Sequence, residues 1–204
     1  DNQMIKPIGK GERTALRIMD AAERLFARNG FQGTTMREIA AEAGLREPGL
    51  YNHFGSKDAL YAAVLERSLR PMEQRIARLL EGPLNPADVL RLPVEMLHLN
   101  AQHPHMAALF YQAIQSLHDS SPAAHAAEWI QRLFAMGREV NRNVMPGDED
   151  TVLLQGIAMF NLCCGYFLAA PMVQELTGCD PQSPEALAKQ QQLMERVMRT
   201  FLIG

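Results

Sequence analysis

The segment from Thr34 to Lys57 constrains the fold of this chain more than any other, because two short helical patterns follow each other there with glycines between them. Thr35 is followed three residues later by a glutamate, which is a capping box for a helix over residues 36–43. Pro48 suits the first turn of a further helix over residues 47–54. Helices this short cannot bury a core alone, so we expect them to pack against a third helix.

The rest of the chain also has the patterning of helices. Apolar residues recur at helical spacing over residues 12–29, and a long helix is expected after Ser56, bending or breaking near Pro71 and ending by Gly82. Further helical patterns cover residues 87–102, 104–117, 123–145, 149–176 and 184–202. No run alternates between apolar and polar residues as a half-buried strand would. We therefore predict an all-α fold of about nine helices.

Charge is distributed unevenly along the chain. The net charge is −3, but residues 2–57 carry nine basic and six acidic side chains. The remaining residues are therefore acidic overall. A mildly basic end on an acidic body is typical of a protein that contacts phosphate at one end only.

The predicted helix over residues 47–54 has small and polar residues near its start, as a helix that enters the major groove of DNA needs. Pro48 and Gly49 keep that start slim, so the backbone can approach base edges closely. Asn52 can read adenine, Arg46 can read guanine, and Pro48 can contact a thymine methyl group. The side chains better suited to phosphate oxygens are Thr35, Arg37, Tyr51, His53 and Lys57. The full set expected to contact DNA is Thr35, Arg37, Arg46, Glu47, Pro48, Gly49, Tyr51, Asn52, His53 and Lys57.

This part of the chain resembles the N-terminal signature of TetR-family transcriptional regulators. The residues that carry the resemblance are Gly30-Phe31, Thr34-Thr35, Ile39-Ala40, Ala43-Gly44, Leu50-Tyr51, His53-Phe54 and Lys57. The resemblance implies an N-terminal arm and helix-turn-helix DNA-binding domain over residues 1–57, followed by a helical ligand-binding and dimerisation domain over residues 58–204. It also implies a homodimer on a palindromic operator in double-stranded DNA. Most members of that family are repressors that leave DNA when a small-molecule effector binds.

One position departs from the family pattern. A serine or threonine usually stands where this chain has Arg46, and it caps the recognition helix and contacts phosphate. Because arginine cannot cap in this way, we expect Glu47 to cap the helix and its start to shift by one residue. Alternatively, Arg46 adds a base or phosphate contact of its own. The operator sequence therefore cannot be taken from relatives.

The larger domain has no signature that names its ligand. The resemblance implies that its last two long helices form a four-helix dimer interface, and the small residues Gly165, Ala169 and Ala170 would permit close helix approach. Apolar walls with a few polar groups in the middle helices fit a hydrophobic or aromatic ligand of moderate size. The residues expected to line that pocket are Met96, Phe110, Tyr111, Ile114, Trp129, Leu133, Phe134, Phe160 and Asn161.

Metal binding and catalysis are the alternatives to a regulatory function. Histidine is dense between residues 98 and 125, and Glu95 precedes His98 at Glu-x-x-His spacing. A di-iron bundle needs two such units and two further glutamates, so we expect neither a metal nor a cofactor. The chain shows no Gly-rich phosphate loop and no nucleophile elbow, which argues against an enzyme. The main rival is a helical ligand-binding or metal-binding protein without sequence-specific DNA binding.

The remaining sequence features concern location and redox state. No continuous apolar run reaches the roughly 18 residues that span a bilayer, and no signal peptide opens the chain. We therefore expect a cytoplasmic protein with no membrane partner. Cys163, Cys164 and Cys179 have neither disulfide nor zinc spacing and are expected to be buried hydrophobic residues.

Overall fold

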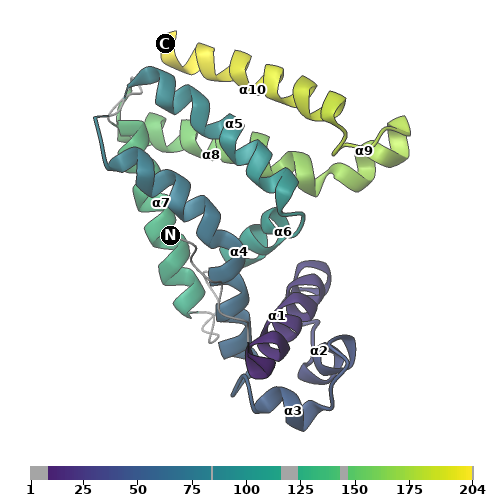
Figure 1. Ribbon diagram of the computed structural model, residues 1–204. Helices are drawn as coiled ribbons and strands as arrows, with labels where there is room; N and C mark the ends of the chain where they lie inside the picture. The colour runs from purple at the N-terminus through teal and green to yellow at the C-terminus, as the bar shows by residue number, and fades with distance from the viewer. Residues whose placement is uncertain (1–8, 84, 116–123, 143–146, 204) are drawn as a thin grey trace, which may run out of the picture.

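The computed structural model describes residues 9–83, 85–115, 124–142 and 147–203, which form helices without any strand (Figure 1). Residues 1–8 of the predicted N-terminal arm lie outside this description. The helices are α1 (Lys10–Asn29), α2 (Met36–Glu42), α3 (Glu47–Tyr51), α4 (Lys57–Leu80), α5 (Pro86–Gln102), α6 (Met106–Gln115), α7 (Ala124–Arg142), α8 (Glu149–Leu168), α9 (Ala170–Thr177) and α10 (Pro184–Ile203). The predicted all-α fold is confirmed.

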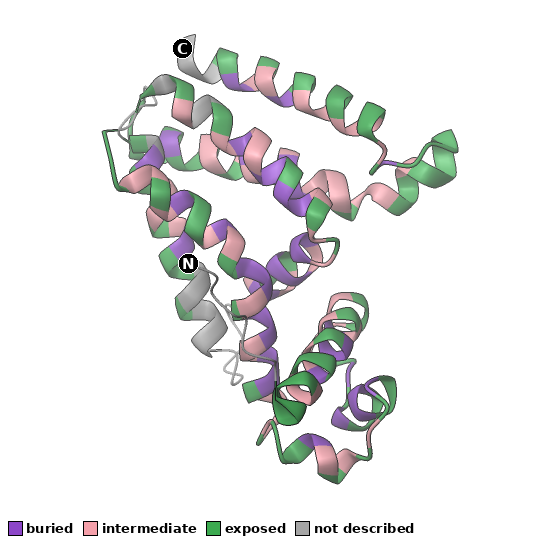
Figure 2. Cartoon of the chain, viewed as in Figure 1, coloured by how far each residue is buried: buried purple, intermediate pink, exposed green. Residues whose placement is uncertain are grey.

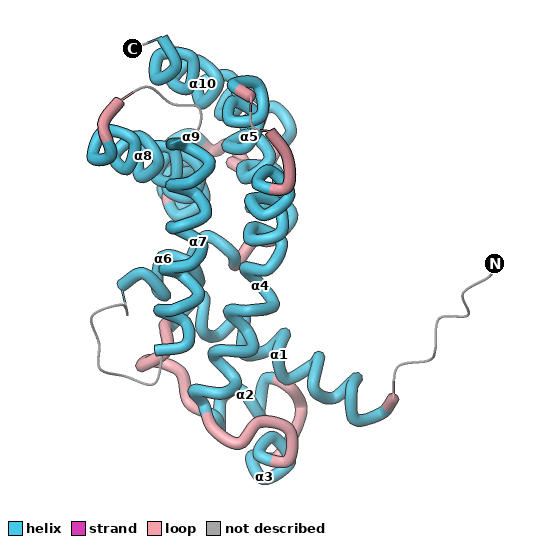
Figure 3. The backbone as a smooth tube through the Cα atoms, turned by 90° about the vertical axis from the view of Figure 1, so that its left-hand side faces the viewer, coloured by secondary structure: helices cyan, strands magenta, loops and turns pink. Residues whose placement is uncertain are grey.

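The molecule is elongated, with a small head at one end and a larger helical body at the other. Helices α1, α2 and α3 form the head, and α4 leads from the head into the body (Figure 1). Figure 3, turned by 90°, shows the same order, with α3 at one tip and α10 near the opposite one. Because α4 contacts α1 as well as α5, α6 and α7, it belongs to both parts of the fold.

Two predicted helix boundaries need correction. The segment over residues 149–176 is not one helix, because α8 ends at Leu168 and α9 begins at Ala170. Pro171 explains the interruption, since it has no amide hydrogen to donate and its ring would clash with the carbonyl group one turn earlier. Conversely, α4 continues without a break through Pro71 to Leu80, where the sequence predicts a bend or a break.

The head has a core of its own where α1, α2 and α4 meet. Ile39 and Leu50 are fully buried, and Phe26 packs edge-on against Tyr61 of α4 with ring centroids 5.0 Å apart. Figure 2 shows the buried positions of the head on the faces that the helices turn toward one another. The short helices α2 and α3 are thus held by packing against α1 and α4, as their length requires.

Helices α8, α9 and α10 leave large apolar side chains uncovered. The exposed ones are Leu153, Leu154, Ile157 and Leu168 of α8, Met172 and Leu176 of α9, and Leu193 of α10. Helix α8 has a mean hydropathy of 1.6 over its most apolar window, of which 22% is buried. It is the one helix in the described part of the chain that is long and apolar enough to span a membrane by length and composition alone. Large apolar side chains that stay exposed on neighbouring helices are typical of an interaction surface.

Candidate DNA-reading surface and ligand cavity

Helix α2 begins with the predicted capping box. The Thr35 hydroxyl accepts a hydrogen bond from the amide of Glu38 at 3.2 Å, and the Glu38 carboxylate accepts one from the amide of Thr35 at 2.8 Å. The same carboxylate also accepts a hydrogen bond from the Thr35 hydroxyl group, with 2.8 Å between the two oxygen atoms. These hydrogen bonds stabilise the charged form of Glu38 and lower its pKa. The start of α2 is therefore fixed in place.

The turn between α2 and α3 depends on a glycine. Gly44 has φ of +67°, a left-handed conformation that other residues rarely adopt, and the amide of Leu45 then bonds the carbonyl oxygen of Ala40 at 2.8 Å. A Cβ atom at Gly44 would also lie 3.0 Å from the Arg17 guanidinium. Both the backbone angle and the space at this turn therefore favour glycine.

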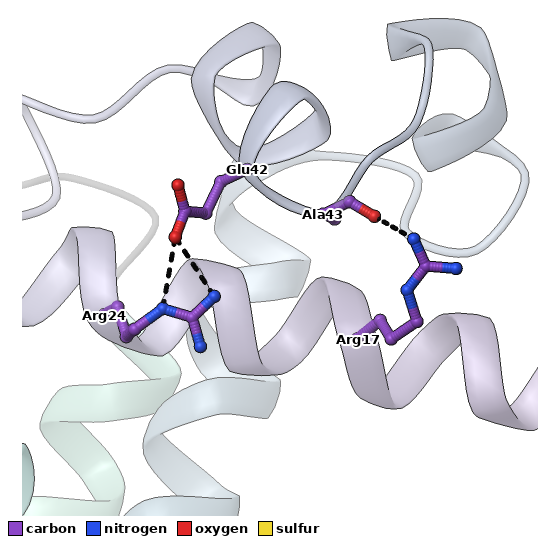
Figure 4. A network of polar contacts seen from close by, with 4 residues as sticks. All are labelled: Arg17, Arg24, Glu42 and Ala43. Carbon is purple, nitrogen blue, oxygen red and sulfur yellow. Dashed lines mark hydrogen bonds and ion pairs between the residues drawn. The ribbon is translucent and has the colours of Figure 1, made fainter.

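Two arginines of α1 hold the C-terminal end of α2 (Figure 4). Arg17 donates a hydrogen bond to the carbonyl oxygen of Ala43, and Arg24 donates two to one carboxylate oxygen of Glu42, at 3.2 and 3.1 Å. Positive charge at this end of a helix is favourable because the last carbonyl groups carry partial negative charge. These two arginines thus fix the angle between α1 and α2 and are engaged within the head.

The start and the end of α3 both differ from expectation. Arg46 is the N-cap residue and its side chain makes no capping hydrogen bond, while Glu47 is the first residue of the helix. The expectation that Glu47 caps α3 and shifts its start is therefore wrong. The helix also ends at Tyr51 rather than residue 54, because the amide of His53 turns to the carbonyl oxygen of Leu50 at 2.9 Å. Asn52 and His53 consequently lie in a turn beyond the helix.

Most residues predicted to contact DNA lie on the surface of the head. Arg46, Pro48, Asn52 and His53 are exposed, as are Thr35 and Arg37 around the start of α2, while Glu47 and Gly49 are half-buried. The Tyr51 side chain is 48% exposed although its neighbour Leu50 is fully buried. Leu50 thus anchors α3 to the core while the adjacent residues face outward. Their individual contacts with DNA stay predictions.

Lys57 is the member of this set that the structure turns inward. Its ammonium group donates hydrogen bonds to the carbonyl oxygens of Phe31 and Thr34, at 2.8 and 3.0 Å. It also lies 4.2 Å from the centroid of the Phe31 ring, within range of a cation–π contact. Lys57 therefore joins the start of α4 to the connection between α1 and α2. This geometry favours a structural role over the predicted phosphate contact.

The body contains an apolar cavity of about 140 Å³ between six helices. Five of the expected ligand residues line it: Met96, Phe110, Leu133, Phe134 and Phe160. Tyr111, Ile114 and Asn161 are not among its lining residues, and the side chain of Trp129 lies outside the description. Because consecutive helical residues point about 100° apart, Tyr111 and Asn161 face away from the side that Phe110 and Phe160 share.

Sequence reasoning missed several residues that the structure brings to this cavity. Helix α4 contributes Met72 and Ile76, α7 contributes Gly137 and Arg138, and α8 contributes Cys163 and Cys164 among others. The sequence does contain a signal for Arg138. It follows Phe134, a predicted pocket residue, by one helical turn and so lies on the same face of α7. No comparable signal joined α4 to α8, because their proximity depends on the packing of the whole body.

The histidine-rich segment gives no support to a metal site where it can be described. Among the side chains included in the structure, no three from His, Cys, Asp and Glu gather closely enough to hold a metal ion. His98 lies 3.3 Å from the side-chain oxygen of Gln191, and Glu95 pairs with Arg75 at 3.5 Å. His118 and the side chain of His125 lie outside the described residues.

Comparison with known proteins gives consistent results. The sequence profile described as "Bacterial regulatory proteins, tetR family" matches residues 18–64, which cover most of the head and the start of α4. The chain is 30% identical over 183 residues to the transcriptional repressor Rv3405c of Mycobacterium tuberculosis, spanning 89% of this chain and 86% of the repressor. It is 32% identical over 100 residues to the repressor SCO4008 of Streptomyces coelicolor, and there it spans about half of each protein.

Solved structures show the same fold. The ketosteroid transcriptional regulator KstR2 of Mycobacterium tuberculosis superimposes with a TM-score of 0.71 at 19% identity, covering 92% of this chain and 94% of that protein. A TetR-family regulator from Bordetella parapertussis superimposes with a TM-score of 0.70 at 20% identity, covering 95% and 96%. The likeness therefore extends from the head through the body.

Proposed function

The chain belongs to the TetR family of DNA-binding transcriptional regulators, and from this premise we propose that it works as a homodimeric repressor in the cytoplasm. A small apolar or aromatic effector would release it from a palindromic operator. The observation that carries the proposal is the geometry of the head, in which a capped α2 and a glycine turn hold α3 with Arg46, Pro48 and Asn52 exposed at its start and end. That geometry is what major-groove reading requires.

A second copy of the chain would cover the apolar face of α8, α9 and α10. Leu154 is 64% exposed and Leu176 is 75% exposed, which is unfavourable for large apolar side chains that stay in water. In a twofold dimer both subunits contribute the same surface, so the apolar side chains of each subunit are covered by those of the other. Such a dimer would also place two heads on the same side of a duplex, as a palindrome needs.

Two helices that line the cavity, α4 and α6, also contact α1 of the head, which provides a route from effector to DNA. Helix α4 lines the cavity with Met72 and Ile76, and its Arg67 pairs with Asp20 and Glu23 of α1 at 2.7 and 2.5 Å. A ligand that shifts α4 therefore pulls on α1 directly.

Helix α6 makes a parallel connection. Phe110 lines the cavity, and two residues later the Gln112 side chain donates a hydrogen bond to the carbonyl oxygen of Ala27 in α1 at 3.1 Å. Movement of either helix would change the position of the head relative to the body. Recognition helices in a dimer must sit about 34–36 Å apart, so a shift of a few ångströms would prevent both from docking.

Selection of bound duplexes from a random pool at near-physiological salt tests the proposal. A homodimeric repressor should enrich a palindromic or near-palindromic consensus. Its affinity for that duplex should fall steeply as salt is raised, because phosphate contacts release counterions. The control is a duplex of the same length and composition with a scrambled sequence, which should bind much more weakly.

Failure to enrich any sequence would overturn the proposal, provided that sedimentation shows a dimer and circular dichroism shows folded helix. Enrichment of a single half-site would retain sequence-specific reading but contradict the dimeric mode. The two results are distinguishable because the selection reports sequence symmetry directly.

A further inference from the structure

The wall of the cavity is built for one aromatic ring. Phe110, Phe134 and Phe160 all line it, and their ring centroids lie 4.7, 6.1 and 6.3 Å apart in pairs. Its volume of about 140 Å³ is close to that of cavities of about 150 Å³ that accept benzene. The three rings already pack against one another at these separations and so form one aromatic side of the cavity, against which an entering ring can pack.

A single charged side chain borders this apolar space. Of the lining residues that the structure describes, Arg138 alone is charged, and the others are apolar residues, glycines and two cysteines. Arg138 is exposed and also lines an adjoining hollow of about 300 Å³, together with Arg142, Asp148 and Glu149. The guanidinium therefore stands at the boundary between the apolar cavity and solvent.

The neighbouring charges are already engaged, whereas Arg138 is not. Asp148 accepts a hydrogen bond from the amide of Thr151 at 2.8 Å, which caps α8, and Glu149 pairs with Arg142 at 3.7 Å. Within the described residues, Arg138 forms neither an ion pair nor a side-chain hydrogen bond. Its five N–H donors therefore have room for an anionic group.

Cys164, which also lines the cavity, adds no competing negative charge. A hydrogen bond with Cys163, together with burial, raises the pKa of the Cys164 thiol well above its usual value. Cys164 consequently stays neutral at physiological pH. An anion at Arg138 therefore meets no thiolate at Cys164, and the two carboxylates of the adjoining hollow, Asp148 and Glu149, are held by the amide of Thr151 and by Arg142.

We propose that the effector is an aromatic carboxylate, with its ring among the three phenylalanines and its carboxylate on Arg138. This inference rests on the proposed function and names the chemistry of its effector. Guanidinium and carboxylate match in a planar, two-bond geometry, which makes Arg138 the residue that selects acids over neutral analogues. A cavity of about 140 Å³ that Arg138 itself lines favours a monocyclic acid with a brief linker.

Direct calorimetric titration of the purified dimer without DNA tests this assignment. The probes are benzoate, phenylacetate, 3-phenylpropanoate and 4-phenylbutanoate, each beside its uncharged amide. At least one acid should bind. Its amide should bind at least about tenfold more weakly, as expected for loss of a charge-assisted hydrogen bond. Arg138→Met should lower the affinity for the acid to that for the amide and leave amide binding unchanged.

Two further variants separate charge from shape. Arg142→Met removes a positive charge one helical turn away that does not line the cavity, and it should change acid affinity by less than about threefold. Gly137→Leu places a side chain in the cavity and should abolish binding of acids and amides alike. Melting curves and binding to the selected duplex establish that each variant is folded.

Three results would overturn the proposal: equal affinity for acids and amides, an acid preference that survives Arg138→Met, or no binding of any acid by a folded dimer. These outcomes are independent of DNA recognition. A protein that binds the acids but selects no duplex contradicts the repressor function and keeps the aromatic acid site. A protein that selects a palindrome but binds none of the acids contradicts the aromatic acid site and keeps the repressor function.

Discussion

Tyr61→Phe should stabilise the protein at neutral pH, in contrast to most substitutions in a core. The Tyr61 side chain is 1% exposed and packs between Phe26 and Phe31, with ring centroids 5.0 Å away in both cases. Its hydroxyl group is buried and finds no hydrogen-bond partner among the described residues. Phenylalanine keeps the ring packing and removes the unpaired polar group, so the free energy of unfolding should rise by about 1 kcal/mol.

The same substitution should remove an alkaline transition. Burial raises the pKa of Tyr61 to about 12, from 10.0 for an unperturbed tyrosine. Above pH 10 the unfolded chain loses this proton and the folded chain retains it, so stability is unaffected below pH 10 and falls as the pH rises toward 12. Two pKa units correspond to a loss of about 3 kcal/mol once the pH is above 12, about half of which is reached at pH 11, and Tyr61→Phe should abolish this loss.

Urea unfolding followed by circular dichroism at pH 8 and pH 11 measures both effects. Protomer concentration must be held constant, because the stability of a dimer depends on it. Tyr166→Phe is the matched control: the Tyr166 hydroxyl donates a hydrogen bond to the carbonyl oxygen of Pro181 at 2.6 Å, so its removal should cost about 1 kcal/mol. If Tyr61→Phe is as destabilising as Tyr166→Phe at pH 8, the hydroxyl is not unpaired and the reasoning fails.

Other substitutions test the reading surface, the cavity helix and the dimer face. Tyr51→Ala should weaken binding to selected and scrambled duplexes alike, whereas Asn52→Ala should change the preference between sequences; an unchanged selected consensus in the second variant would contradict base reading by Asn52. Gly137→Ala should raise the free energy of unfolding in urea by about 1 kcal/mol, because a Cβ there meets no atom within 4 Å and alanine favours helix; a fall would show that the site is crowded. Leu154→Glu should produce monomers in sedimentation, and a dimer that persists would exclude this face as the interface.

The head was the part of the fold most accessible to sequence reasoning, because its elements depend on short-range rules. A threonine and a glutamate three residues apart define the start of α2 through hydrogen bonds between them. A glycine at the turn supplies a backbone angle that other residues avoid. Such features act between near neighbours and can be recognised without knowing how the rest of the chain packs.

The ends of α3 could not be predicted in the same way. Helix capping preferences argued that Arg46 would be displaced as the N-cap, yet it holds that position without a side-chain hydrogen bond. Packing explains this result, because fully buried Leu50 fixes the rotation of α3 against the head whatever residue precedes it. Tertiary contacts here outweigh a capping interaction of about 1 kcal/mol.

The cavity shows where sequence patterns lose their power. Helical spacing can place Phe110 and Tyr111 on different faces of α6, but it does not indicate which face meets α8. The choice depends on contacts between helices far apart in sequence, such as that between the rings of Phe110 and Phe160 at 4.7 Å. Helical spacing places Arg138 on the same face of α7 as Phe134, but its role follows from a cavity that six helices complete.

The structure also limits what an effector can change. The head keeps fully buried residues of its own, Ile39 and Leu50, and its turn and caps are closed by hydrogen bonds within α1, α2 and the start of α4. Of the helices that line the cavity, α4 and α6 make the main contacts with α1 in the described part of the chain, so an effector should shift the position of the head and leave its internal structure intact. Affinity for an isolated half-site should therefore be insensitive to effector, whereas affinity for the full palindrome falls. The effector can shift that balance only by the difference in its own affinity for the two dimer geometries.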